Sequence, residues 1–347
     1  MLNLSAEKEK SMNIVVLCGG TSSERDVSIS SSEKIARALM ENGHQIALAD
    51  VFFGSEKPIE FSAEFDIGSE AGRLRALSAS LTDELKKDRP FFGPNILDVC
   101  KRADIVFLGL HGENGEDGKI QAFFDLLKIR YTGSGYLGSC VAMSKSLTKD
   151  TISRYVNMAE GEVLNRGWNE KCHISAPCVI KPSNGGSSLG VTIVKNEADK
   201  EKALKEAFKY DDTVLVEEFI EGAELTQGVL GGKALPPVEI RPPENGEYDY
   251  ENKYNGLTKE ICPAPLEEKV LKQMSSYSEL IGKILGLSVY YRIDYILDPS
   301  GKLFCLEANT LPGMTETSLI PQEAAAAGYT YNGLCEKIIE LSLKKYE

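Results

Sequence analysis

The chain contains 347 residues, of which 42% are hydrophobic and 26% are charged, and its formal net charge is -13. A chain of this length exceeds what one hydrophobic core usually supports, so we expect two or three domains. The negative charge argues against non-specific binding to nucleic acid or to an anionic membrane surface.

The eight cysteines are scattered and form no CxxC pair, which is typical of a reduced, cytoplasmic protein. Cys172, His173 and Cys178 lie close together in the sequence, but too few ligands accompany them for a zinc site, and packed thiols are the favoured interpretation. The polar segment 1–13 precedes only a short apolar run, so we expect neither a signal peptide nor a membrane-spanning helix.

The first third of the chain alternates short apolar runs with stretches of helical spacing. The pair Gly19-Gly20 separates the first strand from the first helix, and the polar residues 54–95 predict loops around one helix. This alternation predicts an α/β domain with a largely parallel sheet. The strands are expected over residues 14–18, 45–53 and 105–110, and the helices over residues 28–40 and 120–127.

From residue 145 onwards, short strands alternate with helices and long polar insertions, which indicates a separate structural unit. The strands are expected over residues 177–181, 190–194, 213–219, 288–297 and 303–306, and the helices over residues 145–156, 200–208 and 331–343.

The segment HGENGEDG, residues 111–118, follows an apolar strand with one histidine, three glycines and three carboxylates. Glycine-rich turns of this kind occur for purely structural reasons. Alternatively, the segment lies beyond the carboxyl end of a strand, where open α/β sheets bind their ligands, and His111 faces a charged substrate. In that case Glu113, Glu116 and Asp117 would cap the following helix.

The segment KPSNGGSSLG, residues 181–190, places a lysine at the end of an apolar strand before a loop of small residues. Backbone amides in such a loop can converge on a phosphate while the lysine supplies positive charge. The order of residues is not that of a P-loop, and a plain hairpin turn is the alternative.

The segment VLVEEFIEGAELT, residues 214–226, could bind an adenine nucleotide. Phe219 and the main chain of residues 218–220 offer an apolar slot and a hydrogen-bonding edge for the base, and Glu224 could accept from the ribose hydroxyls. The alternative interpretation is a solvated acidic strand end.

Acidic and amide side chains also occur in two neighbouring predicted strands, with Asp294 in one and with Glu307 and Asn309 in the next. Hard oxygen ligands of this kind suit Mg²⁺ that bridges nucleotide phosphates. A carboxylate inside an apolar strand is costly unless it is paired, which favours a functional interpretation of Asp294.

These segments together resemble the D-alanine-D-alanine ligases of the ATP-grasp superfamily. The likeness extends from GGTSSERDVS through HGENGEDG, YTGSG, KPSNGGSSLG, ENKY and RID to LEANTLPGMTETSL. It implies an α/β, three-domain ATP-grasp architecture, in which an N-terminal domain with an open, mostly parallel sheet (12–133) precedes two α+β domains that clasp ATP (134–216 and 217–347). It also implies a homodimer.

The resemblance implies an enzyme that joins two D-alanines through a D-alanyl phosphate intermediate, for peptidoglycan synthesis. The implied cofactors are ATP and two Mg²⁺ or Mn²⁺ ions. The implied metal ligands are Asp294, Glu307 and Asn309. The implied ATP contacts are Lys145, Lys181, Glu217, Glu218, Phe219, Ile220, Glu224, Lys253 and Leu306.

The amino-acid site is carried over in the same way. Glu24 matches the residue that binds the ammonium of the first D-alanine, and His111 lies beside that site. Arg292 and the Gly313 amide match the groups that stabilise the tetrahedral intermediate, and Ser318 and Leu319 match those that hold the carboxylate of the second substrate. Ser187 and Tyr254 match residues that complete a hydrogen-bonded group with Glu24, and the segment 248–260 is expected to close the site as a lid.

The chain departs from the family pattern at two places. Residues 143–145 read Met-Ser-Lys where the family usually has Met-Asp-Lys, and residues 157–176 lack the usual proline-rich linker. The alternatives are a ligase that accepts D-serine or D-lactate, another ATP-grasp carboxylate-amine ligase, or a nucleotide-binding regulator. A regulator would need no residue such as Arg292 to stabilise a reaction intermediate.

Overall fold

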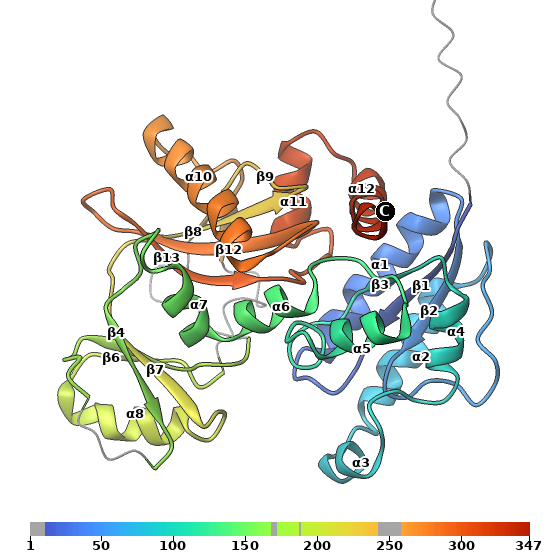
Figure 1. Ribbon diagram of the computed structural model, residues 1–347, viewed down its shortest axis with the longest axis horizontal. Coiled ribbons are helices and arrows are strands. Elements are labelled where there is room, and N and C mark those ends of the chain that lie inside the picture. Colours follow the sequence, from blue (N-terminus) through green and yellow to red (C-terminus); the bar gives the residue numbers. More distant parts are fainter. Residues whose placement is uncertain (1–10, 168–171, 187–188, 242–257) are drawn as a thin grey trace, which may run out of the picture.

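The computed structural model describes residues 11–167, 172–186, 189–241 and 258–347, which form three sheets with their helices (Figure 1). Ser187, Lys253 and Tyr254 lie outside the described residues. The expected α/β class is confirmed, with a parallel sheet at the N-terminus and two antiparallel sheets after it.

The N-terminal sheet has the order β2-β1-β3, and both strand pairs are parallel. Its strands are buried almost throughout, as expected for a sheet covered by helices on its faces. Two helices, rather than the single expected one, lie within residues 54–95. The elements are β1 (Asn13–Cys18), α1 (Arg25–Glu41), β2 (Gln45–Asp50), α2 (Ile67–Ser78), α3 (Asp83–Asp88), α4 (Ile96–Arg102), β3 (Ile105–Leu108) and α5 (Lys119–Leu127).

The second sheet has the order β4-β7-β5-β6 and is antiparallel. Its small core includes Cys178, with Cys172 packed against it, so the interpretation of these cysteines as packed thiols is confirmed. The elements are β4 (Gly161–Asn165), β5 (Cys178–Pro182), β6 (Thr192–Val194), η1 (Glu197–Asp199), α8 (Lys200–Ala207) and β7 (Thr213–Glu218). The expected domain boundary after residue 216 therefore falls inside β7.

The third sheet follows the order β11-β10-β8-β12-β13, with β9 paired to β8. The elements are α6 (Tyr136–Met143), α7 (Lys145–Ile152), β8 (Ala223–Leu230), β9 (Lys233–Ala234), β10 (Val238–Arg241), β11 (Lys259–Ile261), α10 (Glu268–Leu285), β12 (Tyr290–Leu297), β13 (Leu303–Asn309), α11 (Leu319–Ala326), α12 (Tyr331–Leu343) and η2 (Lys344–Tyr346). Helices α6 and α7 contribute to the core of this sheet through Ala142 and Ile152, although they precede the second sheet in the chain.

The last helix, α12, returns to the N-terminal unit and lies beside α1 (Figure 1). Its buried face, which includes Leu334 and Ile338, belongs to the same hydrophobic cluster as β1. The buried His44 ring adds a polar contact, because its Nε2 lies 3.0 Å from Oε2 of Glu336. The C-terminal helix therefore fixes the N-terminal unit against the third sheet. None of the helices in the described residues is long and apolar enough to span a bilayer.

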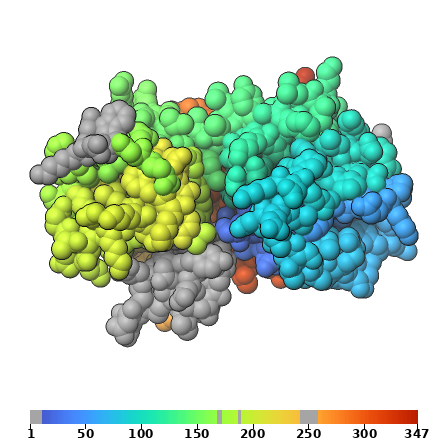
Figure 2. All heavy atoms as spheres, turned by 90° about the horizontal axis from the view of Figure 1, so that it is seen from below, coloured from blue at the N-terminus to red at the C-terminus, as the bar shows by residue number. Residues whose placement is uncertain are grey.

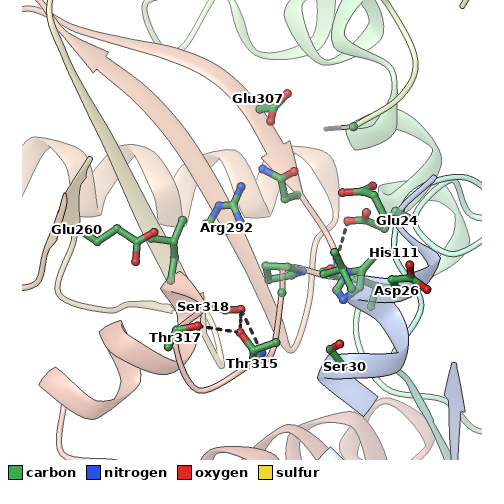
Figure 3. A pocket seen from close by; sticks show the side chains of 18 residues that line it. Glu24, Asp26, Ser30, His111, Glu260, Arg292, Glu307, Thr315, Thr317 and Ser318 are labelled. Carbon is green, nitrogen blue, oxygen red and sulfur yellow. Dashed lines mark hydrogen bonds between the residues drawn. The ribbon is translucent and has the colours of Figure 1, made fainter. Parts of the chain in front are cut away.

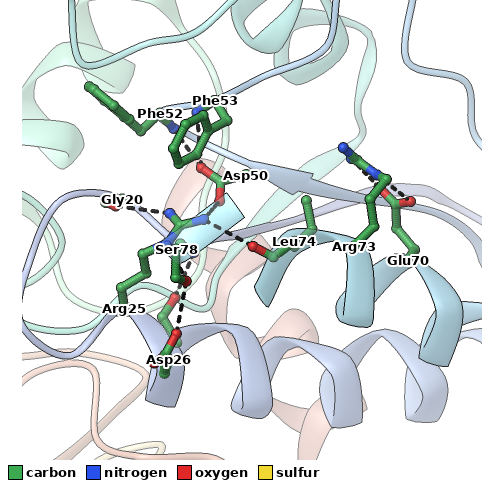
Figure 4. A network of polar contacts seen from close by, with 12 residues as sticks. Gly20, Arg25, Asp26, Asp50, Phe52, Phe53, Glu70, Arg73, Leu74 and Ser78 are labelled. Atoms are coloured by element: carbon green, nitrogen blue, oxygen red, sulfur yellow. Dashed lines mark hydrogen bonds and ion pairs between the residues drawn. The ribbon is translucent and has the colours of Figure 1, made fainter. Parts of the chain in front are cut away.

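A buried ion pair anchors the start of α1 (Figure 4). The guanidinium of Arg25 pairs with Asp50 at the end of β2, and both side chains are buried. Arg25 also donates to the Gly20 carbonyl at 3.0 Å. Gly19 is required here because it has a φ of +76°, and a Cβ would lie 2.3 Å from the Asp50 carboxylate. This network fixes the position of Glu24, the residue just before α1.

We expect Asp50→Ala to lower the free energy of unfolding by about 3–5 kcal/mol, because it leaves the buried Arg25 charge without its partner. Urea unfolding followed by circular dichroism measures the change. The control Glu60→Ala removes an exposed pair with Arg102 and should cost no more than about 1 kcal/mol. Equal losses in the two variants would contradict the prediction.

Candidate active site

A cavity of about 240 Å³ lies between the second and third sheets. The cavity combines a set of apolar side chains with lysines and carboxylates, so it can hold a flat ring and face an anionic group at the same time. Residues 218–220 and Glu224 border it as well. The apolar residues are Val179, Leu189, Val191, Ile193, Phe219, Ile220, Ile296 and Leu306.

Two lysines face this cavity, and each is paired with a carboxylate. Lys181 Nζ lies 2.6 Å from Oε2 of Glu217. Lys145 Nζ lies 3.2 Å from Oε2 of Glu307 and donates to the Gly185 carbonyl at 2.7 Å. Burial alone would lower the pKa of Lys181, but the charge of Glu217 outweighs it and raises the pKa above its usual value. Lys181 is therefore charged at neutral pH.

Ser144, which stands where the family usually has aspartate, helps to hold Lys145 in place. Its hydroxyl caps α7 by accepting from the Leu147 amide at 3.4 Å. It also joins a buried cluster of three hydroxyls, in which Ser146 and Ser183 lie 2.7 Å apart. The Lys145 amide donates to the Ser183 carbonyl at 2.8 Å. The start of α7 is thus fixed to the end of β5 without an aspartate at residue 144.

The acidic residues of β12 and β13 lie opposite one another in the antiparallel ladder. Asp294 pairs in register with Glu307, and Arg292 pairs with Asn309, so the four side chains lie on the same face of the sheet. Arg292 makes two hydrogen bonds of 2.8 Å to the Asp294 carboxylate, and Asn309 Nδ2 donates to it at 3.0 Å. Thr226 of β8 adds a bond of 2.6 Å.

The donor chemistry of this group fits a magnesium ion. Two carboxylates and one amide oxygen are the hard ligands that Mg²⁺ uses together with phosphate oxygens. Among the residues that the structure describes, no cluster of three or more histidine, cysteine or acidic side chains gathers at one point. Asp294, Glu307 and Asn309 could hold a metal ion only as part of a coordination shell that nucleotide phosphates and water would complete.

A second cavity, of about 440 Å³, lies between the N-terminal unit and the third sheet (Figure 3). Glu24 and His111 face it from the N-terminal unit, and Arg292 faces it from β12. Glu307 and Gly186 line both cavities. The two cavities therefore meet at the candidate metal ligand Glu307. Figure 2 shows the two lobes between which the C-terminal chain is visible.

The 111–118 turn forms hydrogen bonds to both the carbonyl and the amide of Leu311. His111 Nδ1 donates to the Leu311 carbonyl at 2.8 Å, and its Nε2 lies 3.3 Å from the Ser31 hydroxyl. Glu116 accepts from the Leu311 amide at 3.0 Å and from the Gly112 amide at 2.8 Å. Burial lowers the pKa of His111, so the ring is neutral with its proton on Nδ1.

Only part of the expected helix cap is present in this turn. Asp117 accepts from the Lys119 amide at 3.2 Å, and Glu113 lies 3.5 Å from the Lys119 ammonium. The expectation for Glu116 is wrong, because its carboxylate turns away from α5 and binds Leu311. The turn thus positions the segment that carries Gly313.

The other wall of the large cavity is the segment that leads into α11. Gly313, Ser318 and Leu319 line the cavity, and α11 begins at Leu319. The Ser318 hydroxyl lies 2.7 Å from that of Thr315 and accepts from the Thr315 amide at 3.1 Å. The N-terminus of α11 favours a negatively charged group, such as a carboxylate, beside Ser318.

The structure brings most of the predicted site residues together around the two cavities. Glu217 differs from the expectation in one respect, since its side chain lies between two lysines while its strand borders the nucleotide-sized cavity. Lys149 and Thr226 were not among the residues expected at the site, and Glu116 was expected only as a helix cap. The i, i+4 spacing of Lys145 and Lys149 was a usable signal for the first of these.

We expect the ionisation of Glu116 to destabilise the protein. Burial and the nearby charge of Glu24 raise the pKa of Glu116 from 4.5 to about 7. Because the folded state holds this proton more tightly than the unfolded state, the stabilisation is complete below about pH 4.5 and is lost as the pH rises through 7. As the pH rises from about 4.5 through 7, the urea midpoint of the wild type should fall relative to that of Glu116→Gln. At higher pH the difference between the two midpoints should stay constant. Parallel pH curves would contradict the assignment.

Two family profiles match nearly the whole chain. The profile described as D-ala D-ala ligase N-terminus matches residues 13–134, and the one described as D-ala D-ala ligase C-terminus matches residues 137–340. The D-alanine--D-alanine ligase of Pediococcus pentosaceus is 41% identical, over 97% of this chain and 99% of that protein. The enzyme of the same name from Lacticaseibacillus casei is 40% identical, over 96% of this chain and 97% of that protein.

Solved structures show the same relationship. The D-alanine--D-alanine ligase from Bacillus anthracis complexed with ATP has a TM-score of 0.75 and 29% identity, over 96% of this chain and 98% of that chain. The VanG D-Ala:D-Ser ligase from Enterococcus faecalis has a TM-score of 0.78 and 26% identity, over 96% of this chain and 100% of that chain. These relatives and solved structures each match at least 96% of the chain, and the chain belongs to the D-alanine-D-alanine ligase family.

Proposed function

We propose that this protein is an ATP-dependent ligase that joins two D-alanines into D-alanyl-D-alanine for peptidoglycan precursor synthesis, acting in the cytoplasm. The observation that carries the proposal is the meeting of the two cavities at Glu307. One cavity offers lysines and an apolar slot for ATP, and the other offers Glu24, Arg292 and Gly313 for amino acids.

The smaller cavity binds ATP. The base lies among the apolar side chains, the main chain of residues 218–220 meets its edge, and Glu224 accepts from the ribose. Lys145 and Lys181 face the phosphates and offset the charge that develops during phosphoryl transfer. Asp294, Glu307 and Asn309 would hold Mg²⁺ or Mn²⁺, which would supply Lewis-acid neutralisation of the phosphate oxygens. Two metal ions are proposed on the strength of the family resemblance.

The larger cavity binds the amino acids. Glu24 accepts from the ammonium of the first D-alanine, whose carboxylate oxygen attacks the γ-phosphorus and releases ADP. The amine of the second D-alanine, with its carboxylate at Ser318 and the α11 N-terminus, then attacks the acyl phosphate. Arg292 and the Gly313 amide stabilise the oxyanion, a contribution that is about 3–4 kcal/mol for one donor in other enzymes. Collapse of the tetrahedral intermediate expels phosphate.

Water must be excluded, because it would hydrolyse the acyl phosphate. We assign this task to the segment 248–260, of which the described part places Glu260 at the large cavity. Ser187 and Tyr254 are proposed to complete the hydrogen-bonded group with Glu24. Lys253 is proposed to contact ATP. All three assignments rest on the resemblance of the surrounding motifs.

A D-alanine-D-serine ligase is the second candidate, because a D-Ala:D-Ser ligase is among the solved structures that share this fold. The experiment that tests both proposals measures ADP formation with each acceptor and identifies the products by mass spectrometry. We expect ADP release that depends on D-alanine, and D-alanyl-D-alanine as the main product when D-alanine, D-serine and D-lactate compete. ATP turnover that no D-amino acid stimulates would contradict the proposal.

We expect Glu307→Gln to lower turnover at least a hundredfold and leave the melting temperature nearly unchanged. The substitution preserves side-chain volume but removes one anionic metal ligand at the point where the cavities meet. Initial rates over a Mg²⁺ titration measure the effect, and the exposed Glu201→Gln serves as the control. A near-normal rate with unchanged Mg²⁺ dependence would reject Glu307 as a metal ligand.

A homodimer is proposed from the family resemblance, and exposed apolar side chains of α5 and α6 are its candidate contacts. Leu126 of α5 is 83% exposed, and Leu137 and Tyr136 of α6 are 64% and 51% exposed. We expect the double variant Leu126→Glu, Leu137→Glu to sediment as a monomer at concentrations where the wild type is a dimer. The control Tyr210→Ser, on the second sheet's unit, should leave the dimer intact. A monomeric wild type would contradict the proposal.

A further inference from the structure

We propose that Lys149, which lines neither cavity, is a positioning residue that keeps the nucleotide cavity positively charged by neutralising Glu217. The inference rests on the proposed binding of ATP in that cavity. It concerns how the charge of Lys181 stays available to the phosphates.

Glu217 lies between two lysines. Its Oε1 is 2.7 Å from Nζ of Lys149, and its Oε2 is 2.6 Å from Nζ of Lys181. Only 5% of Glu217 is exposed. Lys149 also donates to the Ala159 carbonyl, which fixes its ammonium group behind the carboxylate. Glu217 and Lys181 line the nucleotide-sized cavity, so Lys149 acts on it through Glu217.

Two ammonium groups against one carboxylate leave this group with one net positive charge. If Lys149 were absent, Glu217 would cancel the charge of Lys181, and the pair would offer nothing to an anionic phosphate. Burial alone would raise the pKa of Glu217, but the charges of Lys181 and Lys149 outweigh it and hold the pKa below its usual value. Glu217 therefore stays ionised and needs both lysines.

The need for a compensating cation is increased by the other carboxylates at the cavity. Asp294, Glu307, Glu218 and Glu224 all border it. A triphosphate carries several negative charges. If a lysine of this group were lost, the carboxylates of the cavity would repel the triphosphate more strongly. Because the site is partly closed to solvent, salt screens these charges less than it screens charges on an open surface.

Helix α7 explains how Lys149 reaches Glu217. Lys145 and Lys149 are one turn apart on this helix and point to the same side. Lys145 pairs with Glu307 on β13 of the third sheet, and Lys149 pairs with Glu217 on β7 of the second sheet. Ile152 packs the helix into the core of the third sheet. Lys149 thus ties the second sheet to a helix that belongs to the third.

The test measures binding by calorimetry, without turnover, for ATP, ADP and adenosine. We expect Lys149→Met to lower the affinity for ATP and for ADP at least tenfold, while the affinity for adenosine changes less than twofold. Lys149→Arg should stay within threefold of the wild type, and the exposed Lys205→Met should have no effect.

A double variant separates electrostatics from loosened packing. The double variant Lys149→Met, Glu217→Gln also lacks the charge of Glu217, so no carboxylate at residue 217 opposes Lys181. This variant should recover at least half of the ATP binding free energy that Lys149→Met loses. Unchanged ATP affinity in Lys149→Met, equal losses for ATP and adenosine, or no recovery in the double variant would each overturn the inference. A wild type that binds no ATP would overturn the proposed function as well.

Discussion

The site depends on acidic side chains that are paired with cations. Glu217 is paired with Lys149 and Lys181, Glu307 with Lys145, and Asp294 with Arg292. Partly buried carboxylates are costly without such partners. The pair of Glu217 and Lys149 joins the second sheet to a helix of the third. Together the pairs gather the lysines, the candidate metal ligands and Arg292 around the two cavities.

Much of the N-terminal unit could be predicted from the sequence, because its strands are short β-branched runs and its helices show regular apolar spacing. Strand β8 escaped prediction because Thr226 and Gln227 are buried in it. The burial of these polar residues depends on partners far away in the sequence, Asp294 for Thr226 and Ser278 for Gln227. No helix was expected between the strands 213–219 and 288–297, so helix α10 was missed. Its apolar residues do follow helical spacing, and it ends at Gly286 in the left-handed region.

In the site, too, residues that act with sequence neighbours could be predicted, and residues that act with distant partners could not. Asp294, Glu307 and Asn309 could be found as a group because they lie on adjacent strands. The role of the 111–118 turn could not, because Glu116 and His111 bind the backbone of Leu311, about two hundred residues away in the sequence. The i, i+4 spacing places Lys149 on the same side of the helix as Lys145, but its partner Glu217 lies on β7 and could not be found from the helix alone.

The central claim is that the two cavities form one active site in which a D-alanine carboxylate takes the γ-phosphoryl group of ATP. Turnover with D-alanine carrying ¹⁸O in its carboxyl group tests this claim most directly. The account predicts that the released phosphate carries one ¹⁸O atom from the amino acid for each dipeptide formed, because the attacking carboxylate oxygen leaves with the phosphate. Release of unlabelled phosphate alongside dipeptide would contradict it.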